Sequence, residues 1–182
     1  MRADAERNIA TILDAAERVL AATPDAGMAA IARAAGVARQ TVYAHYSSRE
    51  ALLEAVAERA LAQTLAAIDA AEPERGDPRE ALDRLIAAWW GSIGRHARVL
   101  EALAPAMPAH SELRAFHAPI LGRVEALIER GDFARDVPPA WLAAAFLGLM
   151  HTAAEEVASG RLSQEAAGRA LARSIPRLFA DR

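Results

Sequence analysis

The sequence predicts an all-α protein, and three observations carry this prediction. Apolar residues make up 53% of the 182 residues but aromatic residues only 5%, because alanine supplies much of the apolar fraction, and alanine favours helix. Apolar residues recur at helical spacing along most of the chain. No window shows the sustained alternation of valine, isoleucine and aromatic residues that marks a strand. We expect about nine helices, arranged as an N-terminal three-helix domain and a C-terminal helical bundle domain.

The first helix is predicted over residues 4–21, where Ile9, Ile12 and Leu13 begin an apolar face. The loop Thr23–Gly27 ends it, and a short helix follows that stops at Gly36, because glycine adopts the left-handed conformation cheaply. A second short helix begins at Arg39. Its apolar residues face inward and its polar residues outward, so the pair describes a helix-turn-helix.

Residues 47–50, Ser-Ser-Arg-Glu, are typical of a capping box and open a long helix that is predicted to reach about residue 71. Residues 72–78 contain two prolines, a glycine and four charges, and they form the clearest break in the chain. Two helices are predicted beyond it, over residues 79–91 and 93–106.

A helix is predicted over residues 110–130, with Pro119 inside it. Proline removes a backbone donor, so the helix should bend or divide there. The next helix opens at Pro138–Pro139 and runs to about Ala158, and Ser163 caps a final helix that reaches about Phe179.

Composition excludes several classes of protein. Without cysteine there is no disulfide, no thiolate metal site and no cysteine nucleophile. The longest apolar run, Trp141–Met150, is too short to span a bilayer, and no signal-peptide pattern begins the chain. We therefore expect a cytoplasmic protein without a membrane partner. No catalytic constellation and no cofactor motif is visible. His110 and His117 lie seven residues apart, but without carboxylate or thiolate neighbours we expect no metal site.

The net charge is −3, yet residues 33–49 contain Arg33, Arg39 and Arg49 and no acidic residue. This window is locally basic at the helix-turn-helix, where phosphates would be met. All 21 basic residues are arginine, for which a GC-rich coding genome is the simplest explanation.

The same window resembles the DNA-binding domain of the TetR (tetracycline-repressor) family of bacterial regulators. The resemblance is strong over residues 5–58 and rests on architecture alone beyond them. The matching residues are Ile31-Ala32, Ala35-Gly36-Val37, Thr41-Val42-Tyr43, His45-Tyr46 and Ser48-Arg49-Glu50-Ala51-Leu52-Leu53.

The resemblance implies two groups of DNA contacts. The major-groove group is Arg39, Gln40 and Tyr43, and the phosphate group is Thr41, His45 and Arg49. Arginine can bond guanine in two places and glutamine adenine, and free amides in the first turn of a helix attract phosphate near Arg49. The alternative is a solvated helix face.

The sequence departs from the family pattern at two positions. Gly27 and Ala38 stand where the family usually has Ser or Thr capping the two short helices. A lost cap costs roughly 1 kcal/mol for alanine and less for glycine. The departure affects phosphate anchoring rather than the fold.

The last two helices are rich in small residues and joined by a short loop, so two copies can form a four-helix bundle. The family resemblance implies such a homodimer, and the alternative is a core helix of one subunit. The predicted dimer residues are Ala167, Ala170, Leu171, Ser174, Ile175 and Leu178.

The C-terminal part also carries large apolar side chains. Plain core packing explains them, but the family encloses an effector cavity in this region, and clefts between helices are common ligand sites. The predicted ligand-binding residues are Trp89, Phe116, His117, Trp141, Phe146, Met150 and His151. The aromatic character suggests a hydrophobic, weakly polar ligand.

Together these features predict a homodimeric transcriptional regulator that is not an enzyme. Residues 1–47 would form the DNA-binding domain and residues 48–182 the effector-binding and dimerisation domain. The simplest mode is repression, with release from a palindromic operator on double-stranded DNA by a small apolar effector. Two alternatives stay open: an all-α enzyme or carrier with an incidental three-helix head, and a DNA binder that needs no effector.

Overall fold

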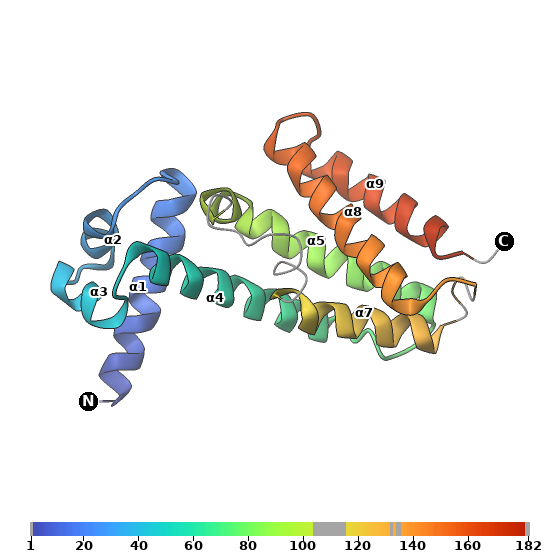
Figure 1. Ribbon diagram of the computed structural model, residues 1–182, viewed down its shortest axis with the longest axis horizontal. Helices are drawn as coiled ribbons and strands as arrows, with labels where there is room; N and C mark the ends of the chain where they lie inside the picture. Colours follow the sequence, from blue (N-terminus) through green and yellow to red (C-terminus); the bar gives the residue numbers. More distant parts are fainter. Residues whose placement is uncertain (1, 104–115, 132, 134–135, 181–182) are drawn as a thin grey trace. The chain divides into compact units, whose positions relative to one another are not determined.

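The computed structural model describes residues 2–103, 116–131, 133 and 136–180. The described residues form eight helices and no strand, which confirms the all-α prediction (Figure 1). The helices are α1 (Arg2–Ala22), α2 (Met28–Ala35), α3 (Arg39–His45), α4 (Arg49–Ala70), α5 (Pro78–Leu103), α7 (Ala118–Arg130), α8 (Pro139–Ala158) and α9 (Gln164–Leu178). No described helix has the length and apolar character needed to cross a bilayer.

The chain divides into two compact units, and α4 and α5 contribute to both. The first unit comprises Met1–Leu61 and His96–Pro108, and the second comprises Ala62–Arg95 and Ala109–Arg182. The predicted boundary between residues 47 and 48 lies within the first unit.

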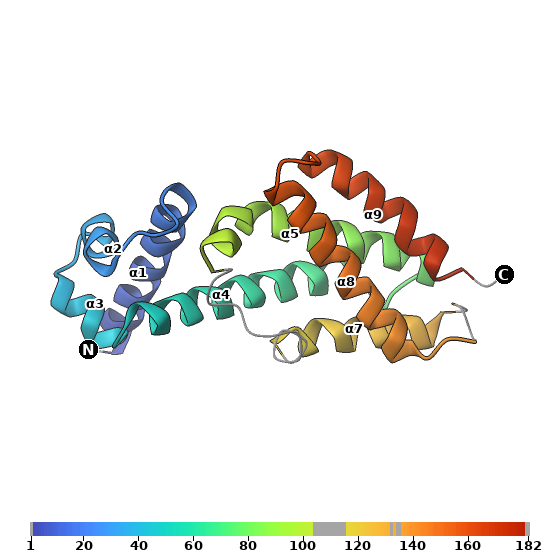
Figure 2. The same cartoon turned by 45° about the horizontal axis from the view of Figure 1, so that its top comes forward.

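In the first unit, α1, α2 and α3 gather around the beginning of α4 (Figure 2). Their apolar faces form one core, in which Ile12, Ile31, Val42, Leu52 and Val56 are fully buried. Gly36 ends α2 at φ 68°, the left-handed conformation that the sequence predicted for the turn. The following amide, from Val37, bonds the carbonyl of Ala32 at 3.1 Å and closes the turn.

The cap of α4 differs from the predicted capping box by one residue. Ser48, rather than Ser47, is the cap, because its Oγ accepts the amide of Ala51 at 3.1 Å. Glu50 therefore lies in the first turn, where a backbone hydrogen bond and the Ser48 hydroxyl lower the pKa of its carboxyl.

In the second unit, α5 corrects the prediction of two helices over residues 79–91 and 93–106. The helix continues without a break through Gly91 and Gly94. Both glycines therefore lie inside α5 and do not end it. On α9, Gly168 permits a close approach to α5, since a Cβ there would lie 2.8 Å from the buried Trp90 ring.

Helix α7 begins at Ala118, so Pro119 falls in its first turn, where proline is tolerated. The earlier part of the predicted helix, including Leu113, lies outside the described residues, as do Met107 and His110. Pro139 starts α8, and Ser163 caps α9 by accepting the amide of Ala166 at 3.1 Å, both as predicted.

Two arginines fasten the loop between α4 and α5. Arg84 donates to the carbonyls of Ala71, Glu72 and Arg75 at 2.8–3.2 Å. Arg130 donates to those of Pro73 and Gly76 at 2.8 and 2.7 Å. A guanidinium carries five donors in a fixed fork, which suits it to bond several carbonyls at once.

Candidate nucleic-acid interface and ligand site

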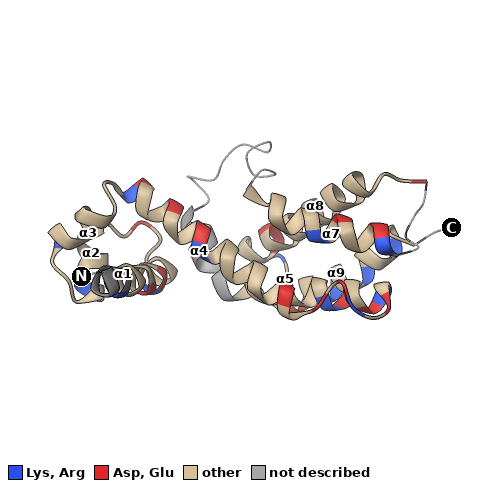
Figure 3. Ribbon diagram, turned by 90° about the horizontal axis from the view of Figure 1, so that it is seen from below, with Lys and Arg blue, Asp and Glu red and all other residues tan. Residues whose placement is uncertain are grey.

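The outward face of α3 carries the residues predicted to read bases. Arg39, Gln40 and Tyr43 are exposed, Tyr43 to 40%, while Thr41 and His45 are half-buried. Helices α2 and α3 carry basic side chains and no acidic one (Figure 3). The arrangement presents polar and cationic groups that can meet a polyanion.

Arg39 and Tyr43 lie together one helical turn apart. Nη2 of Arg39 donates to the Tyr43 hydroxyl at 3.2 Å, and the guanidinium carbon lies 5.3 Å from the centre of the ring. Such a cation–π contact at an exposed site favours the pairing by about 0.5–1 kcal/mol. The guanidinium and the phenol therefore form one paired group.

The caps of α2 and α3 contain no side-chain acceptor. Gly27 and Ala38 both have extended backbone, and the amide three residues on bonds the carbonyl of the cap residue itself. These bonds are 3.0 Å from Ala30 to Gly27 and 2.9 Å from Thr41 to Ala38. In the serine-capped helices α4 and α9 the equivalent amide bonds a hydroxyl. The first turns of α2 and α3 therefore lack the side-chain hydrogen bond that stabilises the first turns of α4 and α9.

Arg49 has partners inside the protein. Its Nε donates to the carbonyl of Ala26 at 3.2 Å and its Nη2 to that of Pro24 at 2.9 Å. The guanidinium is thus turned to the loop before α2. The predicted phosphate contact now competes with an internal role for this side chain.

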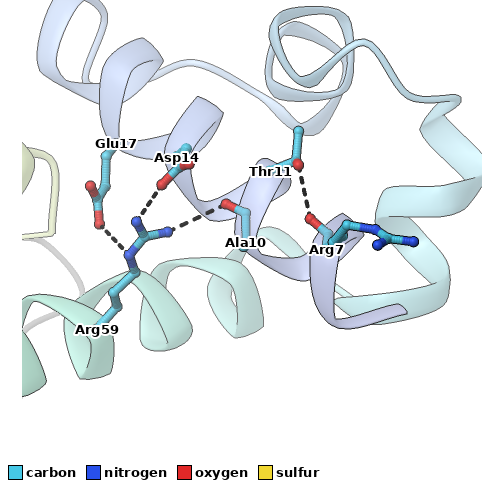
Figure 4. A network of polar contacts seen from close by, with 6 residues as sticks. All are labelled: Arg7, Ala10, Thr11, Asp14, Glu17 and Arg59. Carbon is cyan, nitrogen blue, oxygen red and sulfur yellow. Dashed lines mark hydrogen bonds and ion pairs between the residues drawn. The ribbon is translucent and has the colours of Figure 1, made fainter. Parts of the chain in front are cut away.

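A second arginine on α4 holds α1 (Figure 4). Arg59 pairs with Asp14, lies 3.4 Å from Oε1 of Glu17, and donates to the carbonyl of Ala10 at 3.4 Å. This cluster could not be predicted from the sequence, because Arg59 is more than 40 residues from its partners on α1 and no motif joins them. Arg59 attaches α1 to the first half of α4.

The predicted ligand residues largely meet in the second unit. His117, the residue before α7, stacks on Trp89 of α5 with ring centres 6.0 Å apart. Phe116 and His151 each meet the His117 ring edge-on at 5.1 Å. Phe146 of α8 stacks on Trp89 with ring centres 5.3 Å apart. Five of the seven predicted residues therefore form one continuous aromatic cluster.

The remaining two differ in environment. Met150 is fully buried, whereas Trp141 in the first turn of α8 is 66% exposed. The exposed indole does not belong to the core of its own unit. Sequence reasoning also missed the buried hydroxyl pair of Thr64 and Ser92, whose oxygens are 2.7 Å apart between α4 and α5.

The predicted dimer residues fall into two groups on α9. One group is buried within the second unit and consists of Ala167, Leu171 and Ile175. The other is exposed and consists of Ala170, Ser174 and Leu178. The buried group forms core in this chain, so only the exposed group is available to a partner.

The described residues contain no group of three or more His, Asp or Glu side chains placed to hold a metal ion. Of the two histidines considered for a metal, His110 lies outside the described residues.

Comparisons with known proteins agree on one family. The family described as bacterial regulatory proteins, tetR family, matches residues 12–56. The transcriptional repressor LfrR of Mycolicibacterium smegmatis is 34% identical over 157 residues, which cover 85% of this chain and 82% of LfrR.

Solved structures show the same fold. The crystal structure of LfrR in complex with proflavine has a TM-score of 0.72 and 29% identity, and the match covers 97% of this chain and 99% of that one. The fatty acid degradation regulator FadR from Bacillus halodurans has a TM-score of 0.77 at 19% identity, covering 92% and 93% of the two chains. This second likeness concerns the fold alone.

Proposed function

The chain belongs to the TetR family of bacterial regulatory proteins and is a DNA-binding transcriptional regulator, and we propose that it is a repressor released from a palindromic operator by a small aromatic molecule. The observation that carries the proposal is the exposed Arg39–Tyr43 face of α3 in a helix-turn-helix. The relationship to LfrR, named as a repressor, favours this function over an enzyme or carrier.

In this proposal, residues 1–47 form the DNA-binding domain and residues 48–182 the effector-binding and dimerisation domain. Arg39, Gln40 and Tyr43 read base edges in the major groove, and Thr41 and His45 contact phosphates. The exposure of the first three and the absence of acidic side chains on α2 and α3 support these roles. Arginine and glutamine are the side chains that pair with guanine and adenine in two places.

The test begins with the DNA that the purified protein retains from a random-sequence pool. Arg39→Ala should cost about 1–3 kcal/mol on the selected site and relax sequence preference at one position of each half-site. The control is Arg75→Ala, which removes an equal charge from an exposed loop in the second unit. A wild-type protein that retains no preferred sequence would contradict the proposal, as would unchanged preference in Arg39→Ala.

We further propose a two-fold dimer built on the exposed face of α9. Ala170, Ser174 and Leu178 recur every four residues there, and Leu178 is 46% exposed. Small residues allow helices to approach closely, and a two-fold dimer matches a palindrome. Light scattering should give twice the 19.4 kDa chain mass, and glutamates at Ala170 and Ser174 should halve it without loss of helix content. A folded wild-type monomer at micromolar concentration would exclude the dimer.

The effector site is proposed at the aromatic cluster of Trp89, Phe116, His117, Phe146 and His151, with Met150 in its wall. The rings stack on one another and Trp89 and Phe146 are buried, so in this proposal a flat aromatic ligand separates two stacked rings and takes the place of one of them. Proflavine is the first probe to use, because the related regulator LfrR has a crystal structure in complex with that compound. A hundredfold release from DNA requires the ligand to favour the released state by about 2.7 kcal/mol.

The ligand test uses tryptophan fluorescence. Proflavine or a related ring compound should change the emission of the buried tryptophans, Trp89 and Trp90. The change should survive Trp141→Phe, which removes an exposed indole from outside the cluster. The same compound should release DNA from the wild type and release it less from Phe146→Leu. A regulator that binds its site while no aromatic compound in the screen releases it would instead be the effector-independent DNA binder.

A further inference from the structure

Arg49 is the first residue of α4, and its guanidinium bonds two carbonyls of the loop between α1 and α2. We propose that Arg49 is a positioning residue that fixes the start of the helix-turn-helix from within the protein and does not anchor a phosphate. The two oxygens belong to Pro24 and Ala26, two residues apart, and lie 2.9 and 3.2 Å from separate guanidinium nitrogens. This inference rests on the DNA-binding function, but its structural half is measured without DNA.

The loop needs such a support for a local reason. Ala26 is only 8% exposed, so its carbonyl has restricted access to water and requires a partner. The next residue, Gly27, begins α2 without a side-chain cap. Within the loop, the amide of Ala26 bonds the carbonyl of Thr23 at 3.0 Å. The hydrogen bonds from Arg49 on α4 therefore stabilise the residues before α2, as the hydroxyls of Ser48 and Ser163 stabilise the starts of α4 and α9.

The position of Arg49 gives this hold a functional consequence. Helix α3 follows α2 through the tight Gly36 turn, so the orientation of α2 sets the orientation of Arg39 and Tyr43. Arg49 ties the beginning of α2 to the beginning of α4 within the first unit. Loss of these two hydrogen bonds should therefore reduce the difference in affinity between the preferred DNA sequence and other sequences. Loss of a phosphate contact would instead weaken binding to all duplexes equally.

Lysine discriminates between the two roles. Its ammonium is a point charge that serves phosphate well, but it cannot present the planar fork that spans two carbonyls. Arg49→Lys should therefore behave like Arg49→Ala. Without DNA, amide exchange over residues 26–31 should accelerate about tenfold in both variants, as expected for loss of a charged hydrogen bond. Arg75→Ala is the control and should leave that exchange unchanged.

With the selected DNA, both variants should lose about tenfold in specific affinity and keep the wild-type slope of log affinity against log salt. Full binding by Arg49→Lys, together with a slope lowered by about one unit in Arg49→Ala, would overturn the proposal in favour of a phosphate contact. Wild-type exchange over residues 26–31 in both variants would overturn it as well. If the wild type bound no specific DNA, the proposed function would fail while the exchange result still decided the tie.

A rescue variant tests the route of the effect. Gly27 has φ −91° and ψ 171°, and a Cβ there would meet no atom within 4 Å, so serine fits. Its hydroxyl can accept the Ala30 amide as Ser48 accepts that of Ala51. Gly27→Ser in the Arg49→Ala background should recover part of the exchange protection and of the specific affinity. Recovery of neither would show that Arg49 does not act through this loop.

Discussion

Replacing Ala38 with serine should stabilise the protein. Ala38 caps α3 with φ −64° and ψ 145°, a conformation that serine adopts freely, and its side chain is exposed. A serine cap in place of alanine contributes about 0.5–2 kcal/mol. The Thr41 amide already bonds the Ala38 carbonyl at 2.9 Å, so the gain should fall in the lower half, about 0.5–1 kcal/mol.

For a chain of this length, 1 kcal/mol corresponds to about 2–4 °C in melting temperature, so a rise of about 1–4 °C is expected. Differential scanning calorimetry on the DNA-free protein measures it. Ala38→Val is the control, since it enlarges the side chain without adding an acceptor and should not raise the melting temperature. An equal rise in melting temperature in both variants, or no rise with serine, would refute the reasoning that a side-chain acceptor at the cap of α3 stabilises the protein.

Two further results are expected. Arg123 pairs with Asp69 and lowers the pKa of its carboxyl, so the stabilisation is present above the unfolded pKa and is lost as pH falls through the folded pKa. Asp69→Asn should therefore cost at most about 1 kcal/mol at pH 7, because the pair is partly exposed, and the difference in urea titrations should shrink as the medium is acidified through that folded pKa. Gly168→Ala should lower the free energy of unfolding by about 1–3 kcal/mol, because its Cβ would collide with Trp90. Gly122→Ala, in open space on α7, should raise the free energy of unfolding by about 0.5–1 kcal/mol. Equal effects of the two substitutions in urea titrations would contradict the close contact at Gly168.

Features fixed by neighbouring residues could be predicted from the sequence. The left-handed turn at Gly36, the start of α8 at Pro139 and the Ser163 cap each depend on backbone preferences within a few residues. The length of α5 could not be predicted in this way, because local preference does not distinguish Gly91 and Gly94, which lie inside the helix, from a glycine such as Gly36 that ends one.

The candidate sites show the same division. The aromatic cluster was predicted by residue type, and the structure brings most of it together. On α9, Ala167, Leu171 and Ile175 repeat every four residues, as do Ala170 and Ser174 on the adjacent face. Helical spacing separates these two rows of residues in the sequence. It does not show which row is buried, because burial depends on where the other helices of the unit lie.

The loop over residues 71–76 has features of a trypsin-cleavage site. Its residues 72 and 74–76 are exposed, Glu72 and Gly76 have positive φ, and the Arg75 side chain is 72% accessible. A protease must draw its substrate into an extended strand, and five guanidinium bonds from Arg84 and Arg130 oppose that change. Digestion at Arg75 therefore requires these bonds to open together. The connection between α4 and α5 should behave toward proteases as part of the folded body, despite a composition that resembles a flexible linker.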